Sequence, residues 1–172
     1  ANPLDDVFLL RYMIKKLTYP LLLLILTGLL YSGCVKNETC LPASNLLLID
    51  FYTQENDSTK IELSVDSISM FIIGREDSVL YDNAKGVKSI SIPLSDSLNF
   101  MTVVIKINDA IDTIYLGYRP YSVFRSTECG VINRYETWLP EFTKNRIEKI
   151  ELKNKDIDEN EAVNLFMFLD LS

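Results

Sequence analysis

FMTVVIKI (residues 100–107) and AIDTIYLGY (residues 110–118) are the segments that decide the fold class. Successive residues of a β-strand point to opposite faces of the sheet. The first segment has Met101, Val103 and Ile105 on one side, and Phe100, Thr102 and Val104 on the other. Because both sides are largely apolar, this pattern predicts a central strand that is covered on both faces.

Similar short segments make up most of the chain after residue 40. They lie at residues 45–53, 61–65, 68–72, 79–81, 87–92, 121–125, 131–138, 147–152 and 163–169. The apolar phase changes at Asp66-Ser67, which indicates a bulge or corner, and Pro120 falls between two segments, where proline is tolerated. Short strands at this spacing, without strong helical periodicity, are typical of a sandwich or barrel. We expect one all-β, mainly antiparallel domain over residues 41–172, arranged as a β-sandwich or Ig-like fold.

The N-terminal part has the pattern of a signal peptide. Lys15 and Lys16 precede an apolar run over residues 21–30, which is shorter than the roughly 20 residues of a membrane-spanning helix. The run ends in LYSGC (residues 30–34), which resembles the lipobox read by lipoprotein signal peptidase, with Tyr31 in place of the usual Leu or Val. We expect cleavage before Cys34 and lipid attachment to that cysteine. An ordinary signal peptide and a retained anchor helix are the alternatives.

These features divide the N-terminal region into three parts. Residues 1–12 precede the apparent initiator Met13 and are interpreted as an upstream extension or an artefact. Residues 13–33 are the predicted lipoprotein signal peptide, and residues 34–40 carry the lipid anchor and a short tether. Acyl chains on the cysteine would anchor the protein durably. One glutamate after the cysteine is a poor match to the surface-export signal of Bacteroidota lipoproteins, so the periplasmic face of the outer membrane is favoured over the cell surface.

The charge and the missing histidine limit the classes of function. The 172 residues include 24 acidic and 17 basic ones, a formal net charge of −7. Nucleic acids and anionic lipids both attract clustered Lys and Arg, so we expect no nucleic-acid partner. Histidine is absent, and with it the commonest general base and metal ligand. Residues 154–161 space acidic groups as some calcium loops do, but they lack the required glycine. We therefore expect a non-enzymatic protein without a metal site or a cofactor other than the lipid.

Three cysteines have to be explained in an exported chain. Once Cys34 carries lipid, Cys40 and Cys129 remain. The periplasm is oxidising, so these two predict a disulfide that would close a loop of about 90 residues and stabilise the fold by a few kcal/mol. Two free thiols and intermolecular bonds are the alternatives.

Four triplets combine Asp, Ser or Thr, and an apolar residue: Asp66-Ser67-Ile68, Asp77-Ser78-Val79, Asp96-Ser97-Leu98 and Asp112-Thr113-Ile114. Asp and Ser favour turns because they bond to their own backbone, and this explains the triplets structurally. The triplet also resembles the O-glycosylation acceptor of the Bacteroidota. That resemblance predicts sugar on one or more of Ser67, Ser78, Ser97 and Thr113.

Aromatic and arginine side chains gather between residues 115 and 138. Core packing explains most of them, but aromatic residues and Arg are also the usual anchors of protein interfaces. The candidate partner surface consists of Tyr118, Arg119, Tyr121, Phe124 and Trp138.

Several short motifs resemble those of an uncharacterised Bacteroidota outer-membrane lipoprotein family, a mostly β domain of unknown function. The matching stretches are Ile68-x-Met70-x-Ile72-x-Gly74, Asp77-Ser78-Val79-Leu80-Tyr81, Ile92-Pro93-Leu94, Asp112-Thr113-Ile114-x-Leu116-x-Tyr118, Glu128-Cys129-Gly130 and Thr143-x-Asn145-x-Ile147. The resemblance implies an outer-membrane location and no known enzyme activity. It supplies no catalytic residues.

Two hypotheses of function follow. The first is a lipid-anchored scaffold or accessory subunit that docks on another outer-membrane protein, such as a β-barrel. The second is a lipoprotein that binds a glycan or another small ligand on its sheet, using Trp138 and the tyrosines.

Overall fold

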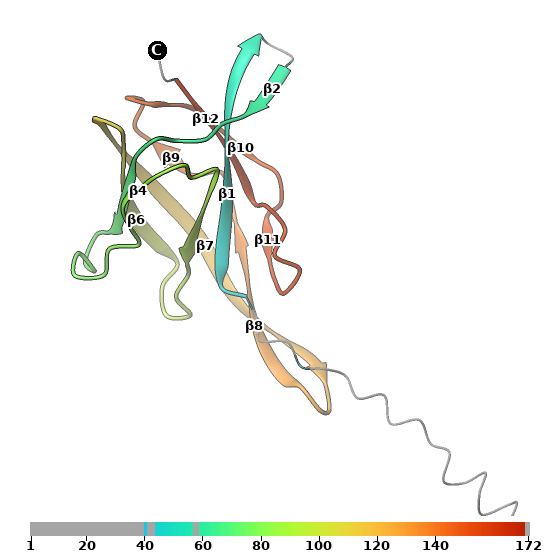
Figure 1. The fold of residues 1–172 in the computed structure, drawn as a ribbon. Coiled ribbons are helices and arrows are strands. Elements are labelled where there is room, and N and C mark those ends of the chain that lie inside the picture. Colours follow the sequence, from blue (N-terminus) through green and yellow to red (C-terminus); the bar gives the residue numbers. More distant parts are fainter. Residues whose placement is uncertain (1–39, 41–43, 57–58, 171–172) are drawn as a thin grey trace, which may run out of the picture. The chain divides into compact units, whose positions relative to one another are not determined.

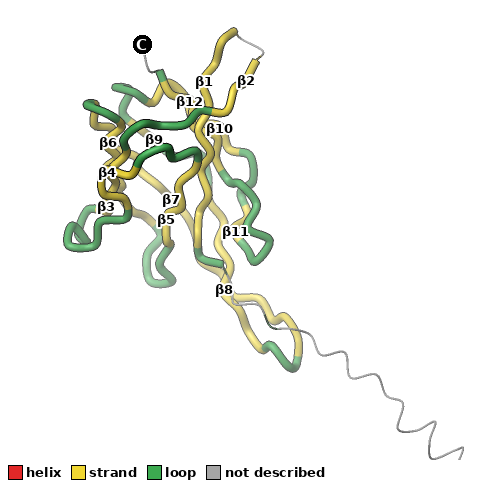
Figure 2. The backbone as a smooth tube through the Cα atoms, in the orientation of Figure 1, coloured by secondary structure: helices red, strands yellow, loops and turns green. Residues whose placement is uncertain are grey.

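The structure, a computed structural model, describes residues 40, 44–56 and 59–170 (Figure 1). Within these residues the regular elements are strands, and Figure 2 shows them joined by loops and turns without a helix. The predicted all-β, mainly antiparallel fold is confirmed. Over the same described ranges, no helix has the length and hydropathy to cross a bilayer.

The first sheet has five strands in the order β10-β12-β1-β2, with β5 also paired to β1. Their bounds are β1 (Leu46–Asn56), β2 (Thr59–Glu62), β5 (Ser89–Pro93), β10 (Ile147–Leu152) and β12 (Leu165–Leu169). β1 and β12 run parallel, and the other pairs are antiparallel. The parallel pair joins the two ends of the domain within one sheet.

The second sheet has seven strands in the order β11-β8-β7-β6-β3-β4, with β9 paired to β7. Their bounds are β3 (Ile68–Ile72), β4 (Tyr81–Ala84), β6 (Phe100–Ile107), β7 (Ala110–Ser126), β8 (Gly130–Thr137), β9 (Glu141–Phe142) and β11 (Asp156–Ile157). All of these pairs are antiparallel.

One hydrophobic core joins the two sheets. Every second residue of the central strands is buried, because alternate residues point inward. The inward positions include Leu47, Ile49 and Phe51 of β1, Val103 and Ile105 of β6, Ile114 and Leu116 of β7, and Leu165 and Met167 of β12. The two sheets therefore turn one face toward this shared core and the other face away from it.

The chain crosses from the first sheet to the second at Asp66-Ser67, where the alternation of apolar and polar residues shifts by one position. Val65 bridges to Val87 beside the first sheet, and Ile68 then begins β3 in the second. Both side chains are fully buried, so the corner at Asp66-Ser67 lets successive segments keep their apolar side in the core.

The expectation of two strands separated at Pro120 is wrong, because β7 runs unbroken from residue 110 to residue 126. The backbone N–H of Tyr118 donates to the carbonyl of Asn99, the residue just before β6 begins, at 2.9 Å. The nitrogen of Pro120, two residues later, points to the same side of β7. No residue of β6 lies opposite it, because the pairing of β6 with β7 stops at Phe100 and Gly117. The missing N–H therefore costs no hydrogen bond between strands.

The expectation that residues 100–107 are covered on both faces is also wrong. Met101, Val103 and Ile105 are buried in the core, whereas Phe100 on the opposite face is 54% exposed. Thr102 and Val104 on the same outer face are only half-buried, so this face of the strand is partly open to solvent.

Candidate interaction surface

The outer face of the second sheet carries a group of half-exposed apolar side chains. We call it the open face, and it consists of Ile73, Phe100, Ile111, Tyr115 and Trp138, which are 41–55% exposed. The register places Phe100 opposite Gly117, and Tyr115 lies two residues earlier on the same side of β7. Ile73 extends this side of β3, where its N–H donates to Thr102 at 2.9 Å.

Trp138 lies directly on the backbone of β7. A Cβ added to Gly117 would come within 2.3 Å of the Trp138 ring, so only glycine leaves room for the indole. The part of the ring with Cζ2, Cε2 and Nε1 therefore packs on the strand, while about half of the side chain stays exposed. The sequence shows both residues but not this contact, which depends on how the chain returns after β8.

A groove of about 560 Å³ adjoins Trp138. Its lining includes Asn99, Arg119, Glu136, Leu152 and Lys155. Hydrogen bonds from Lys155 (2.8 Å) and Arg119 converge on the Glu136 carboxylate and hold its pKa below the ordinary value. These ion pairs are largely exposed, so they orient the groups more than they stabilise the fold.

The outer face of the first sheet is built differently, and we call it the covered face. Its aromatic residues are Tyr52, Phe166 and Phe168, and ammonium groups of three lysines lie over the phenylalanine rings. The distances to the ring centroids are 5.1 Å from Lys60 to Phe166, 5.2 Å from Lys60 to Phe168, 5.6 Å from Lys149 to Phe168 and 5.8 Å from Lys153 to Phe166. Phe168 is only 1% exposed although it lies outside the core cluster.

The structure separates the five residues of the predicted partner surface. Arg119 and Trp138 line the same groove, and Tyr121 shares a side of β7 with Arg119, by strand alternation. Tyr118 is fully buried, with its hydroxyl 3.2 Å from the N–H of Ser95, so its side chain belongs to the core. Phe124 points to the opposite side of β7 from Arg119.

Several members of this surface were not among the predicted site residues. The alternation in residues 100–107 predicts that Phe100 is covered, and Gly117 has no side chain that could indicate a surface role. Glu136 joins Arg119 only because the register pairs their two positions. The alternation of β6 and β7 was the available signal, but it does not tell which face of a sheet another layer covers.

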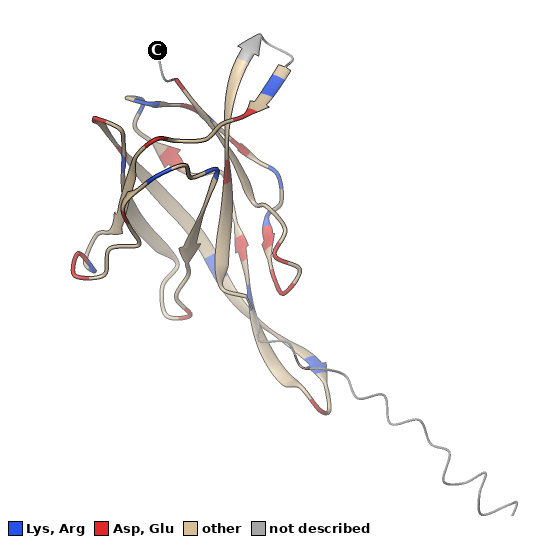
Figure 3. Cartoon of the chain, viewed as in Figure 1, with Lys and Arg blue, Asp and Glu red and all other residues tan. Residues whose placement is uncertain are grey.

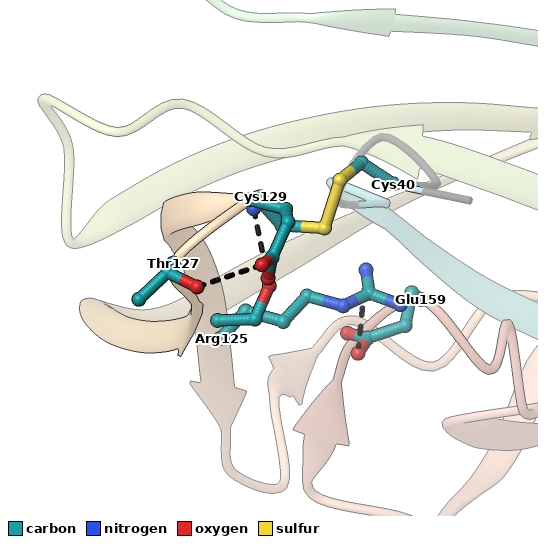
Figure 4. The surroundings of a disulfide bond; sticks show 7 residues. Cys40, Arg125, Thr127, Cys129 and Glu159 are labelled. Atoms are coloured by element: carbon teal, nitrogen blue, oxygen red, sulfur yellow. Dashed lines mark hydrogen bonds and ion pairs between the residues drawn. A yellow bond between two sulfur atoms is a disulfide. The ribbon is translucent and has the colours of Figure 1, made fainter. Parts of the chain in front are cut away.

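The predicted disulfide is present between Cys40 and Cys129, with Cα atoms 5.5 Å apart. Figure 4 shows it at the turn between β7 and β8, beside Arg125 and Glu159. Glu159 lies 3.9 Å from Arg125 and 2.6 Å from Arg134, so it ties the hairpin to the loop after β11. Cys34, the predicted lipid site, lies outside the described residues.

A buried carboxylate connects two of the sequence motifs. Asp112 accepts hydrogen bonds from the Thr143 hydroxyl (2.6 Å) and from the N–H groups of Asn145 (2.8 Å), Arg146 (2.7 Å) and Ile147 (3.0 Å). Burial raises its pKa, but these hydrogen bonds outweigh it and lower the pKa overall. Asp112 therefore attaches β7 of the second sheet to the start of β10 in the first.

The four predicted glycosylation residues differ in access. Ser78 and Ser97 are exposed in loops, whereas Ser67 and Thr113 are half-buried. Ser67 donates to Asn83 at 2.6 Å. Glycosylation itself stays a prediction, and accessibility favours the two loop positions.

The described part of the chain contains no group of three His, Cys, Asp or Glu side chains placed to hold a metal ion. In the acidic segment, Asp158 instead accepts from the N–H and the amide group of Asn160, both at 3.0 Å. Figure 3 shows acidic residues on several loop tips and not in one cluster.

Comparison with known families gives one match. A family described as a family of unknown function (DUF6452) matches residues 52–169, which is more than half of the chain. No curated protein and no solved structure matches the chain. This match covers both sheets, the open face and the covered face, and the chain therefore belongs to the DUF6452 family.

Proposed function

We propose that this protein is a lipid-anchored, non-enzymatic accessory subunit that docks on another outer-membrane protein through its open face. The observation that carries the proposal is the difference between the two outer faces. The chain covers the aromatic rings of one face with its own lysines, and it leaves Phe100, Tyr115 and Trp138 of the other half exposed.

The chemistry of the open face supports a protein partner. Tyr, Trp, Phe and Arg are enriched at the centres of protein interfaces, where they exchange water for apolar contact. Here the apolar residues adjoin the Arg119–Glu136–Lys155 cluster, which could pair with polar groups of a partner. A partner with an apolar strip and polar groups beside it, such as the wall or rim of a β-barrel, has complementary chemistry.

The lipid anchor would allow docking through an interface as small as the open face. Lipid on Cys34 confines the domain to the membrane surface and raises its effective concentration near proteins of the same membrane.

The disulfide agrees with an oxidising compartment. We propose the periplasmic face of the outer membrane, in a member of the Bacteroidota, as the location. Two sheets around one core likewise favour a β-sandwich arrangement.

Purification from membranes in mild detergent tests the docking proposal. The intact protein should bring down a stoichiometric partner, and Phe100→Ser combined with Tyr115→Ser should lose it. Ile61→Ser, at a similarly exposed position of β2 in the first sheet, is the matched control and should keep the partner. Recovery of the intact protein alone at native abundance would contradict the proposal.

A second function, binding of a glycan or another small ligand, is favoured by the placement of Trp138. The indole packs on Gly117, is about half exposed, and lines a groove together with Asn99, Arg119 and Glu136. The C–H face of a sugar ring can stack on such an indole while its hydroxyl groups bond to the polar side chains. A glycan array with a Trp138→Ala control separates the two functions, because a docking subunit binds no sugar.

A further inference from the structure

The β7–β8 hairpin extends beyond the strand that supports its first half. The first residue of β6, Phe100, lies opposite Gly117, and beyond Gly117 β7 pairs with β8 alone. Figure 1 shows this part of the hairpin projecting past the other strands of the domain. Near its tip Phe124 lies directly opposite Val131, and the two side chains are 66% and 64% exposed.

The same tip is the part of the domain that is covalently closest to the predicted anchor. The Cys40–Cys129 disulfide fixes Cys40 to the turn between the two strands. Cys34 precedes Cys40 by six residues, which span at most about 20 Å when fully extended. The lipid attachment point therefore stays within that distance of the disulfide.

We propose that the tip of the β7–β8 hairpin is a membrane-contact site, with Phe124 and Val131 inserted among lipid headgroups. This inference rests on the lipid anchor of the proposed function. Apolar and aromatic side chains are favoured at the headgroup level of a bilayer. The short tether raises the local concentration of the tip at the surface, so two side chains are enough for contact.

The charges at the tip point to apolar insertion and not to attraction by anionic lipid. Arg125 and Arg134 are paired with Glu159. Glu128 in the turn accepts a hydrogen bond from the Thr127 hydroxyl at 2.8 Å, and this bond lowers its pKa, so it carries a negative charge. Contact should therefore persist on zwitterionic lipid and should not require anionic headgroups.

The membrane-contact site and the open face are separate surfaces. Phe124 and Arg119 lie on opposite sides of β7, and Ile111 of the open face lies at the far end of the same strand. The hairpin tip can therefore rest on the bilayer while the open face remains available to a partner.

Fluorescence quenching tests this inference on the lipidated protein in phosphatidylcholine vesicles that contain brominated acyl chains. The chain has a single tryptophan, so Trp138→Phe with Phe124→Trp places the only indole at the tip. Trp138→Phe with Ile111→Trp is the matched control, because Ile111 is 55% exposed at the opposite end of β7. Circular dichroism and an intact disulfide by mass spectrometry show that both variants are folded.

We expect the brominated lipid to cause a several-fold larger loss of fluorescence for the indole at position 124 than for the one at position 111. Equal quenching at the two positions, or none at position 124, would overturn the inference. Flotation of the same samples with the vesicles tests the anchor independently. A protein that floats without quenching at position 124 refutes only the membrane-contact site, whereas one that does not float refutes the anchor.

Discussion

The covered face and the open face both carry aromatic residues, but these residues differ in how far they are exposed to solvent. Each carries aromatic residues on the outward side of a β-sheet. On the covered face, the ammonium groups of three lysines lie over Phe166 and Phe168, and Phe168 is almost fully buried. On the open face, Phe100 and Trp138 keep about half of their surface in contact with solvent.

This difference shows how one chain can cover the outer face of one sheet with its own side chains and leave the outer face of the other sheet exposed for a partner. A lysine stem covers apolar surface while its charge remains hydrated, and each ammonium group over a ring adds about 0.5–1 kcal/mol. The covered face needs no partner. Within the described residues no ammonium group is placed over the aromatic rings of the open face, and exposed apolar side chains grouped on one face are typical of interaction sites.

Removing the carboxylate that links the two sheets should have the largest effect, because it destabilises the sheets that carry both faces. Asp112→Ala leaves the Thr143 hydroxyl and three backbone N–H groups without their acceptor, which should lower the free energy of unfolding by about 3 kcal/mol. Urea unfolding followed by circular dichroism measures this loss. Glu141→Ala, an exposed carboxylate on β9, is the control and should be neutral. A loss for Asp112→Ala as small as that of the control would show that this attachment does not matter.

Acid should weaken the same attachment more gradually. The pKa of Asp112 is lowered in the folded state, so its stabilising contribution is fully present above the unfolded value of about 4 and is lost as pH falls through the lower folded value. The wild-type protein should lose stability over this acidic range, and Asp112→Asn should lose less over the same range. Equal slopes of unfolding free energy against pH for the two proteins would contradict this assignment.

Removing the lysines from the covered face should have a moderate effect on the stability of the fold. Lys60→Ala with Lys149→Ala removes the ammonium groups nearest to Phe168 and should lower the free energy of unfolding by about 1 kcal/mol. The corresponding Lys→Met variants keep most of the stem and should lose less. Lys106→Ala, on the outward side of β6, is a second control that should have no effect. Binding of a hydrophobic dye to the alanine variant would show directly that the face has become open.

Polar substitution on the open face should have the smallest effect on stability and should still abolish docking. Phe100→Ser should change the free energy of unfolding by no more than about 0.5 kcal/mol, because exposed positions contribute little to the fold. Phe168→Ser, its counterpart on the covered face, should destabilise the protein clearly in the same urea experiment. If the two substitutions cost the same, the two faces do not differ in the way proposed.

Much of the fold could be predicted from alternation of apolar residues along the chain. The predicted segment 147–152 coincides with β10, and 100–107 coincides with β6. The continuous strand through Pro120 could not be predicted, because tolerance of proline there depends on where the pairing of β7 with β6 stops. The expected strand at residue 79 instead begins at Tyr81, and Val79 is 52% exposed.

The candidate site could be predicted only in part, for a similar reason. Arg119 and Trp138 were recognisable from residue type, whereas Glu136 and Lys155 reach them through strand register and through the turn into β11. The clustering of aromatic residues and Arg places Tyr118 on the predicted surface, yet its side chain is fully buried and its hydroxyl accepts a hydrogen bond from the N–H of Ser95. Residue type indicates what a side chain can do, but its burial depends on the layer that packs against it.

The position of the disulfide also determines how the domain responds to mechanical tension. The bond spans a sequence separation of 89 residues, and β1 to β7 all lie between the two cysteines. A pull from the membrane on a tethered domain would enter at the β7–β8 turn and bypass β1, which could not be stretched out from its N-terminal end. Tension on the proposed tether would thus fall on the hairpin and leave the parallel β1–β12 pair relaxed.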